Sequence, residues 1–438
     1  MTHARFLSVL RISICMLVVS IWFPGATQIS GTDGSLSFLL ALLCTVIGVA
    51  VYGKAAGNLH RNDALFMLGL LAVAGLIVLL ALLSMLYADN PLRTLRVVFA
   101  QIFGFALLPT IAALAMGPRG PAEIDGIVSA FIGMGVVTAC LVIAGLGDAN
   151  FADRAAGYFK HANQLGIAMS AVLPLVAARL LLARRHRILL LGCTAAIVLG
   201  LVMSGSKTNF VVGTMGLLVF FTLYGVYLAA RRRRPVALLA GLVAIPLTAQ
   251  ATLLTLQAFN PRAYRLLALQ FSGGDAHSMV SREQLWAMSI ELGLAHPFTG
   301  VGAGQPIGDI APHSHNLFVE YFRTMGVPGA ALIALMVFLV ALYLAAAVLH
   351  TLFRGRERTE TANVMLLGSA VSAWNYLLAN QMSDSFGPST APFFWLPLAL
   401  LVVYHGAQRS LRPATRAPLH ASRLPRPVGA PIAGETPR

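Results

Sequence analysis

The sequence predicts an all-α protein that crosses a membrane many times. Only 11% of its 438 residues are charged and 58% are hydrophobic, whereas a soluble domain carries roughly 25% charged residues. Apolar runs close to the ~20 residues needed to cross a bilayer recur along the whole chain. Backbone groups in lipid must form their hydrogen bonds within the segment, and the alternating pattern of a membrane β-barrel is missing, so these runs are predicted to be helices.

Twelve membrane-spanning helices are expected. The first apolar run could be a signal peptide, but it has no convincing small-residue cleavage site and many spans follow it, so it is predicted to stay as the first helix. All four cysteines fall within the runs, which predicts neither a disulfide framework nor a zinc site. The runs are about 6–24, 36–53, 65–86, 97–116, 126–146, 163–182, 188–204, 209–230, 235–255, 326–350, 363–381 and 390–407.

Lys and Arg residues divide unevenly between the two sets of loops. Of the 31, 22 fall on the face that also carries both chain ends, among them the runs ARRHR at 183–187 and RRRR at 231–234. Basic residues concentrate in short cytoplasmic loops, so both termini are predicted to be cytoplasmic. The net charge of +15 therefore reflects membrane topology, and no nucleic-acid partner is expected.

This topology divides the chain into four parts. Residues 1–255 hold helices one to nine, and residues 326–407 hold helices ten to twelve. Between helices nine and ten, residues 256–325 form a large outer loop, and loops of this length are usually functional. Within the loop, SREQLWAMSIELGLA predicts a helix that HPFTGVGAGQP ends. Residues 408–438 are rich in Pro and Arg and are predicted to be a disordered cytoplasmic tail.

Nine Lys and Arg residues fall on the outer face, where the topology rule disfavours them. Any single one can be a lipid-headgroup anchor or a salt-bridged loop residue. As a set they have few acidic partners in the outer loops, which favours a surface for a phosphate- or diphosphate-bearing lipid that arginine forks bind bidentately. The nine are Arg93, Arg96, Arg154, Lys160, Lys207, Arg262, Arg265, Arg282 and Arg323.

Three of the outer segments place cations beside turns or helix ends. In DRAAGYFKHANQLG at 153–166, Arg154, Lys160 and Asn163 precede a span, so they form either an anion site at a helix N-terminus or an ordinary basic helix entry. In SGSKTNF, Lys207 lies in a tight turn. In NPRAYRLLAL, Arg262 and Arg265 lie three residues apart on one helical face. This arrangement costs energy unless an anion or solvent separates the two charges.

The stretch PHSHNLFVEYFRTMGVPG at 312–329 adds a second group of polar residues. If a helix begins at Asn316, the side chains of Asn316, Glu320 and Arg323 lie within about 60° of one another. His313 and His315 precede this stripe. No third and fourth metal ligand has suitable spacing, so we expect no metal and no cofactor. A neutral imidazole acting as general base, or orienting an acceptor hydroxyl, fits better, and either histidine can fill that role.

HNLFVEYFRTMGVPG resembles the signature of bacterial O-antigen ligases: a His, then Asn, Ser or Gln, nine residues, a Gly, and Gly, Thr or Tyr three residues later. The fixed positions here are His315, Asn316, Gly326 and Gly329. RAAGYFKHANQLG and SREQLWAMSIELGLAHPFTGVGAG resemble further blocks of a superfamily that includes O-antigen polymerases and pilin oligosaccharyltransferases. The resemblance covers the architecture of the whole chain and implies a type C glycosyltransferase-like fold.

The resemblance also implies a reaction. O-antigen ligases transfer O-antigen polysaccharide from undecaprenyl diphosphate to lipid A-core oligosaccharide, as part of lipopolysaccharide biosynthesis. They act at the periplasmic face of the bacterial inner membrane, without a metal and with inversion of the anomeric centre. The expected donor, acceptor and location follow from this likeness, and the topology predicted from charge places the histidines on the periplasmic side independently.

The roles of single residues follow from the same likeness. His315 occupies the motif histidine position, with His313 as the rival base. Arg154 matches the basic residue of an R-x-x-G block, and Arg265 the arginine expected early in the large loop. The leaving diphosphate is expected to bind Arg154, Lys160, Lys207, Arg262 and Arg265 in place of a divalent cation. The supporting residues are Asn163, Arg282, Asn316, Glu320 and Arg323.

Three other functions stay open. An O-antigen polymerase uses the same donor chemistry with another carrier-linked glycan as acceptor, and a protein O-oligosaccharyltransferase modifies a protein. A transporter of lipid-linked sugars would also use cations. Transporters, however, carry their polar sites near the bilayer midplane on broken helices. The polar residues of this chain gather at one interface, which favours an enzyme.

Overall fold

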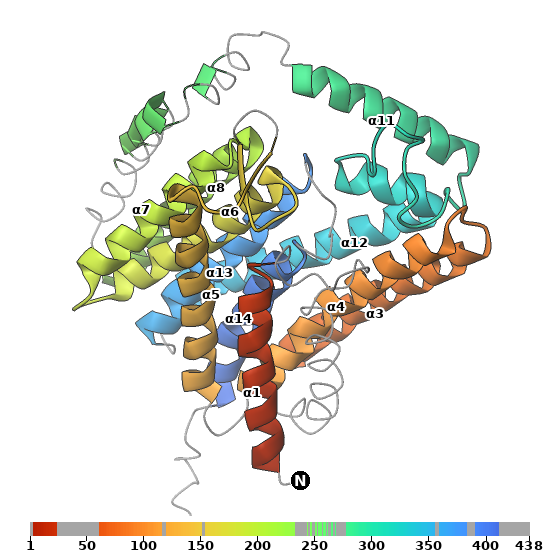
Figure 1. The fold of residues 1–438 in the computed structure, drawn as a ribbon. Helices are drawn as coiled ribbons and strands as arrows, with labels where there is room; N and C mark the ends of the chain where they lie inside the picture. Colours follow the sequence, from red (N-terminus) through yellow and green to blue (C-terminus); the bar gives the residue numbers. More distant parts are fainter. Residues whose placement is uncertain are drawn as a thin grey trace, which may run out of the picture.

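The computed structural model describes residues 3–23, 61–115, 120–150, 154–232, 277–354, 359–382 and 390–410, with short pieces between 243 and 268. In these parts the chain forms eleven α-helices, one 3-10 helix (η2) and a two-stranded antiparallel sheet (Figure 1). The elements are α1 (His3–Ser20), α3 (Arg61–Leu83), η2 (Ser84–Leu86), α4 (Pro91–Ala115), α5 (Gly120–Ile143), β1 (Asp148–Asn150), β2 (Arg154–Gly157), α6 (Ala162–Leu182), α7 (Arg187–Met203), α8 (Lys207–Arg232), α11 (His277–Ala295), α12 (Leu317–Arg354), α13 (Glu360–Ala379) and α14 (Pro392–Ser410).

The prediction of a polytopic helical membrane protein is confirmed. Ten of the twelve predicted spans coincide or overlap with described helices, and the expected helix in the large loop is α11. Five helices are long and apolar enough to cross a bilayer: α3 with η2, α5, α6, α8 and α12. The predicted span at 36–53, most of 235–255 and the tail after residue 410 lie outside the described residues, so the total of twelve stays a prediction.

Helix α12 begins earlier than the predicted span. It starts at Leu317, where Asn316 caps it: the Asn316 Oδ1 atom accepts hydrogen bonds from the backbone N–H groups of Phe318 (3.0 Å) and Val319 (3.1 Å). The helix is interrupted at Gly326, whose φ of 66° and ψ of −162° are not helical. A short segment with one polar stripe therefore precedes the long apolar one, and Gly326 marks the junction between them.

The hairpin β1–β2 was not predicted from the sequence. Its strands pair antiparallel, with Asn150 opposite Arg154. They approach so closely that a Cβ atom on Gly147 would lie 2.8 Å from the backbone of Gly157. The hairpin leads directly into α6 and so delivers Arg154 to the entrance of that helix.

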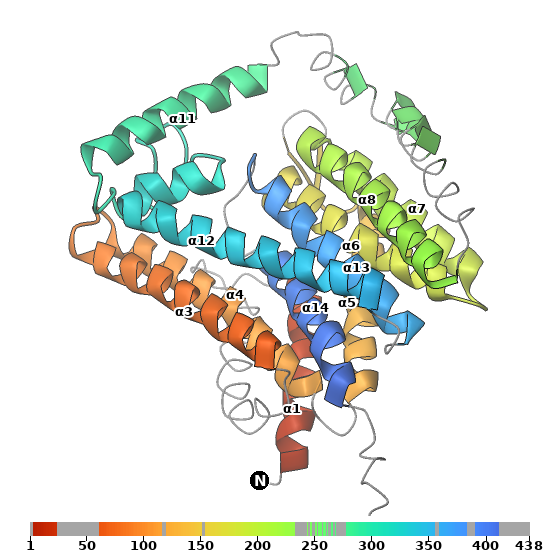
Figure 2. The same ribbon diagram turned by 180° about the vertical axis from the view of Figure 1, so that it is seen from behind.

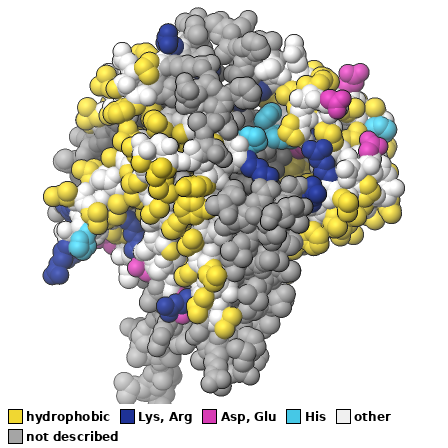
Figure 3. Space-filling model, viewed as in Figure 1, with side chains coloured by type: hydrophobic (Ala, Val, Ile, Leu, Met, Phe, Trp, Pro, Cys, Tyr) yellow, Lys and Arg dark blue, Asp and Glu magenta, His cyan; other side chains and the backbone are white. Residues whose placement is uncertain are grey.

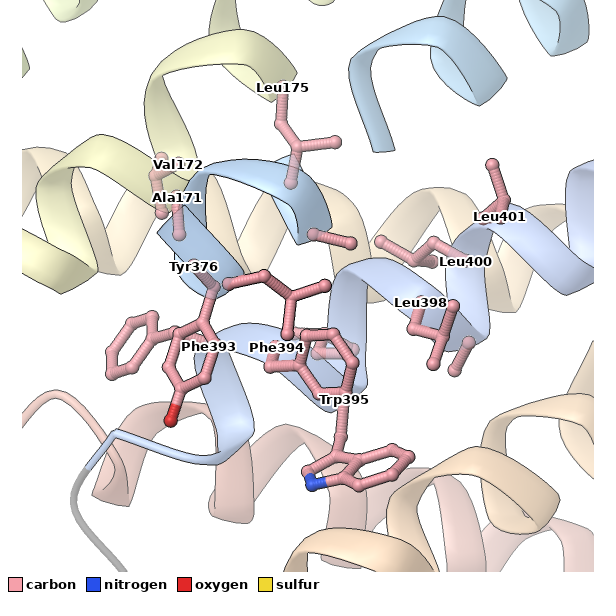
Figure 4. Close-up of a cluster of buried hydrophobic side chains, with 14 of the residues drawn as sticks. Ala171, Val172, Leu175, Tyr376, Phe393, Phe394, Trp395, Leu398, Leu400 and Leu401 are labelled. Atoms are coloured by element: carbon pink, nitrogen blue, oxygen red, sulfur yellow. The ribbon is translucent and has the colours of Figure 1, made fainter. Parts of the chain in front are cut away.

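The core lies where α6, α13 and α14 pack against one another. Figure 4 shows the aromatic side chains of Phe393, Phe394 and Trp395 from α14 beside Tyr376 of α13 and Ala171 of α6, all fully buried. Helices α3, α4 and α12 lie side by side and incline away from this core, with α11 packed on α12 (Figures 1 and 2). Helix α6 is thus buried on nearly all sides.

Helices α6 and α13 run antiparallel in a register set by two polar contacts. Ser372 Oγ donates to the carbonyl of Ala171, and Asn375 Nδ2 donates to the carbonyl of Ser170 at 3.0 Å. Gln381 lies six residues beyond Asn375, and Gln164 lies six residues before Ser170. The C-terminal end of α13 is therefore level with the first turn of α6.

A buried carboxylate joins three helices toward the opposite end of α12. Asp63 of α3 accepts a hydrogen bond from Tyr343 of α12 (2.8 Å), and its Oδ1 atom lies 2.6 Å from Nδ1 of His405 in α14. An ionisable residue within membrane helices needs such partners, because an isolated charge there is costly. This contact ties the inclined helices to the core.

Candidate functional site

The first cluster of the site surrounds Arg154, which β2 positions. Its Nε atom donates to the carbonyl of Ser204 (3.0 Å) and its Nη2 atom donates to Oδ1 of Asn163 (2.7 Å). Gly205, with φ of 58°, forms the turn between α7 and α8, and a Cβ atom there would lie 2.9 Å from Arg154 Cγ. The turn thus needs glycine both for its left-handed backbone and for the approach of this arginine.

Asn209 fastens the same turn to the start of α6. Its Nδ2 atom donates to the carbonyl of Asn163 (2.9 Å) and to Oγ of Ser206 (2.8 Å), and Asn209 is fully buried. Polar contacts therefore hold β2 and the nearby α6 entrance to the α7–α8 turn, which lies about 40 to 50 residues further along the chain. The predicted supporting residue Asn163 belongs to this network.

Two further cations join Arg154. Lys207, the first residue of α8, lies within electrostatic range of the guanidinium groups of Arg282 and Arg154. Burial lowers the pKa of Arg282 on α11, although an arginine stays protonated at neutral pH. Like charges repel at this range, so an anion bound among the three would relieve their repulsion. We call Arg154, Lys207 and Arg282 the cation cluster.

The other predicted cations lie differently. Lys160 is exposed between β2 and α6, and Arg265 is exposed in a short described piece of the large loop. Arg262 lies outside the described residues. Arg323 is fully buried, so it is not part of a cationic surface, and the expectation that all nine outer-face cations form one is wrong for this residue.

The second cluster of the site holds the two histidines. The ring centroids of His313 and His315 lie 4.2 Å apart, with an angle of 63° between the ring planes. His315 has a φ of 55°, the sole positive value at a non-glycine residue in the described part of the chain. Both side chains are partly buried, and they lie just before the capped start of α12.

Glu320 and Arg323 form a buried ion pair behind the histidines. Glu320 Oε2 accepts hydrogen bonds from the backbone N–H and the Oγ of Ser314, each at 2.9 Å, and its Oε1 accepts one from Arg323 Nη2 at 2.7 Å. Arg323 also donates to the carbonyls of Gln305 (2.8 Å) and Pro306 (3.2 Å). The predicted polar stripe is thus present, and its charges are paired with each other.

The two clusters lie at the same end of the helix bundle. Asn316 Nδ2 donates to the carbonyl of Gln381 at 3.3 Å, which fixes the histidine segment to the end of α13. That end is level with the first turn of α6, where Asn163 bonds Arg154. In Figure 3, histidine side chains lie near Lys or Arg side chains in the middle of the face shown, and others are scattered over that face. Together the two clusters can supply a base and a binding place for an anion.

Several residues of the site escaped the sequence analysis. Ser314 stands between the two predicted histidines, Gln305 lies in a loop, and Asn209 lies in the first turn of α8, with no local pattern to mark them. Their partners are backbone groups or residues far along the chain, as with Gln305 and Asn90. In the described ranges, no three His, Cys, Asp or Glu side chains are arranged to hold a metal ion; metal independence stays a prediction.

Residues 192–334 match the family model described as O-Antigen ligase. This segment of the chain is an O-antigen ligase domain. It runs from α7 through α8 and α11 into α12 and contains Lys207, Arg282 and both histidines, whereas Arg154 precedes it. The match covers about a third of the chain and indicates a membrane enzyme of the O-antigen ligase and polymerase kind. A search of curated proteins found no match.

Proposed function

We propose that the protein is an O-antigen ligase, which transfers O-antigen polysaccharide from undecaprenyl diphosphate to lipid A-core oligosaccharide. The reaction takes place at the periplasmic face of the bacterial inner membrane. The observation that carries this proposal is the placement of the histidine pair and the cation cluster at one end of the α6–α13 pair. A glycosyl transfer from a lipid diphosphate needs these two functions side by side.

The chemistry assigns a step to each cluster. A hydroxyl of the lipid A-core attacks the anomeric carbon of the glycan from the face opposite the diphosphate. The new C–O bond forms as the bond between the anomeric carbon and the phosphate oxygen breaks. The electron pair of the broken bond leaves with undecaprenyl diphosphate. A neutral imidazole, that of His315 or His313, takes the hydroxyl proton. Attack from the opposite face inverts the anomeric centre.

The cation cluster stabilises the charge that builds on the leaving diphosphate. Fixed positive groups aimed at a developing charge often give the largest single contribution to catalysis. Arg154 is held in place by Ser204 and Asn163 before any substrate arrives. Arg282, expected from the sequence to be a supporting residue, joins Arg154 and Lys207 as a diphosphate-binding residue. Lys160, Arg262 and Arg265 keep the diphosphate-binding role expected from the sequence.

The test is in vitro transfer by the purified protein in detergent with EDTA present. The substrates are undecaprenyl diphosphate-linked O-antigen and lipid A-core. We expect glycan on the lipid A-core with an inverted linkage and no need for added metal. Transfer that requires added Mg²⁺ or Mn²⁺ would contradict metal independence, and a retained linkage would contradict the direct displacement.

A strain that lacks the protein separates the related functions. Loss of a ligase leaves bare lipid A-core and accumulates carrier-linked polymer. Loss of a polymerase instead leaves lipid A-core capped by a single repeat. Loss of a protein O-oligosaccharyltransferase leaves lipopolysaccharide normal and removes a glycoprotein. The first pattern is the one expected here, and either of the others would overturn the assignment as a ligase.

A further inference from the structure

Ser314 connects the histidine pair to the buried ion pair. Its backbone N–H and its hydroxyl both donate to the same oxygen of Glu320, at 2.9 Å each, and the hydroxyl also lies 3.3 Å from the carbonyl of Asn316. Ser314 is fully buried and stands between His313 and His315. The carboxylate of Glu320 therefore fixes the backbone at Ser314, between the two histidines.

The histidine backbone needs such a constraint. His315 has a φ of 55°, and a left-handed backbone is costly for a residue that carries a Cβ atom. Residues in this conformation persist where their surroundings determine it. Both neighbours of His315 are held in place: Ser314 bonds Glu320, and Asn316 caps α12. These contacts fix the backbone of His315.

Arg323 carries the connection from Glu320 to another loop. It is fully buried, and its Nη2 atom bonds both Glu320 Oε1 (2.7 Å) and the carbonyl of Gln305 (2.8 Å). A buried ion pair is a poor source of stability, because desolvation of the two charges offsets their attraction. Its geometry, in contrast, is specific, since Nη1 and Nη2 of Arg323 and both carboxylate oxygens of Glu320 are directed at defined atoms.

Gln305 anchors this loop to α4. Its Nε2 atom donates to the carbonyl of Asn90 (3.0 Å) and to Oγ1 of Thr94 (3.1 Å), and its Oε1 atom accepts from the Asn90 N–H (3.2 Å). Thr94 Oγ1 donates in turn to the carbonyl of Ala303 (2.8 Å). Both ends of the Gln305 amide are thus used at the first turn of a membrane helix.

We propose that Gln305, Arg323, Glu320 and Ser314 form a positioning chain that sets the direction of the histidine rings relative to α4. The proposal rests on the proposed function, in which one of these histidines removes the acceptor proton. None of the four residues is assigned a contact with substrate, so they are positioning residues. Their effect reaches the reaction through the placement of the imidazole.

The two ends of the chain provide the test. We expect Ser314→Ala to lower kcat on the order of 10- to 100-fold, as fits loss of a hydrogen bond to a charged group, while KM for the lipid-linked donor stays within about twofold. Gln305→Ala is expected to give the same split with a smaller loss. In the double variant the losses should not multiply, because both changes release the same histidine segment.

Controls separate positioning from stability. Ser20→Ala removes a buried hydroxyl that bonds its own helix in α1 and should keep kcat, and thermal unfolding in detergent is measured for every variant. Three results would overturn the proposed positioning chain. They are a wild-type kcat in both Ser314→Ala and Gln305→Ala, losses that multiply in the double variant, and a raised donor KM with unchanged kcat. If the wild-type protein itself transfers no glycan to lipid A-core, the proposed function fails instead.

Discussion

The two clusters of the site hold their arginines in different ways. Arg323 is fully buried and donates to a carboxylate and to two backbone carbonyls. Arg154 is partly buried, donates to the neutral oxygens of Ser204 and Asn163, and shares its surroundings with Lys207 and Arg282. Arg323 is thus paired with a carboxylate inside the protein, whereas Arg154 lies within electrostatic range of a second cation, Lys207.

Under the proposed function, this difference separates a structural cation, Arg323, from a substrate-binding one, Arg154. A compensated, buried guanidinium holds loops in place and contributes little to an electric field outside its pair. Cations that lie within electrostatic range of one another favour an anion bound near them. The topology rule alone places both arginines in one outer-face set, so the comparison between them depends on their partners.

The largest effect is expected at the histidine cluster. His315→Ala or His313→Ala, whichever removes the base, should lower transfer by about 10²- to 10⁴-fold, because the acceptor hydroxyl then keeps its proton as it attacks. The assay uses purified donor and lipid A-core with each single variant. The variant at the other histidine should lose less. Unimpaired turnover in both variants would remove the general-base role from this cluster.

The cation cluster should respond in rate with little change in folding. Arg154→Gln is expected to lower kcat by about 10²- to 10³-fold, as with loss of other groups that stabilise a developing anion. The kcat of Arg154→Lys should lie between that of Arg154→Gln and that of the wild type, because lysine keeps the positive charge but loses the two-pronged guanidinium group. The control is Arg184→Gln, an exposed arginine between α6 and α7. Wild-type turnover in Arg154→Gln would contradict the assignment of Arg154 as a diphosphate-binding residue.

Arg323 should respond in stability first. Arg323→Gln leaves the carboxylate of Glu320 buried without its cation, which is expected to cost about 3–5 kcal/mol of unfolding free energy. Thermal unfolding in detergent measures the loss. The matched control is Arg179→Gln, which removes the ion pair between Arg179 and Asp125 whose carboxylate is exposed; exposed pairs contribute about 0–1 kcal/mol. Equal losses at both positions would contradict the structural role of Arg323.

The smallest expected effect concerns the glycine that ends the polar segment of α12. Gly326→Ala should lower the unfolding free energy by about 1–3 kcal/mol, because its φ is 66° and the added Cβ would lie 2.5 Å from the carbonyl oxygen of Pro297. Gly75→Ala in α3 is the control, since no atom lies within 4 Å of its Cβ position, and it should be neutral or slightly stabilising. The same unfolding assay compares them.

The signature that resembles O-antigen ligases has a physical basis in these elements. Its asparagine caps α12, and its first glycine supplies the non-helical backbone at the break. Its histidine takes up the left-handed conformation between them. The nine residues between the His–Asn pair and Gly326 thus form the short first segment of α12.

The sequence by itself determined the helices, because lipid demands long apolar segments that satisfy their own backbone. It also indicated a helix that could begin at Asn316, the helix α11 and the two histidines, all of which depend on residues close together in the chain. It did not indicate the hairpin, nor the network around Gln305.

Only the tertiary structure decided which cations act together. The Arg154–Ser204 contact joins residues 50 positions apart, and the Gln305–Asn90 contact joins residues 215 apart. Such contacts depend on how the helices pack, and no local periodicity encodes them. Burial with Glu320 removes Arg323 from the outer surface, while the turn at Gly205 brings Arg154 beside Lys207. Local sequence therefore sets the elements, and packing assigns each charge its partner.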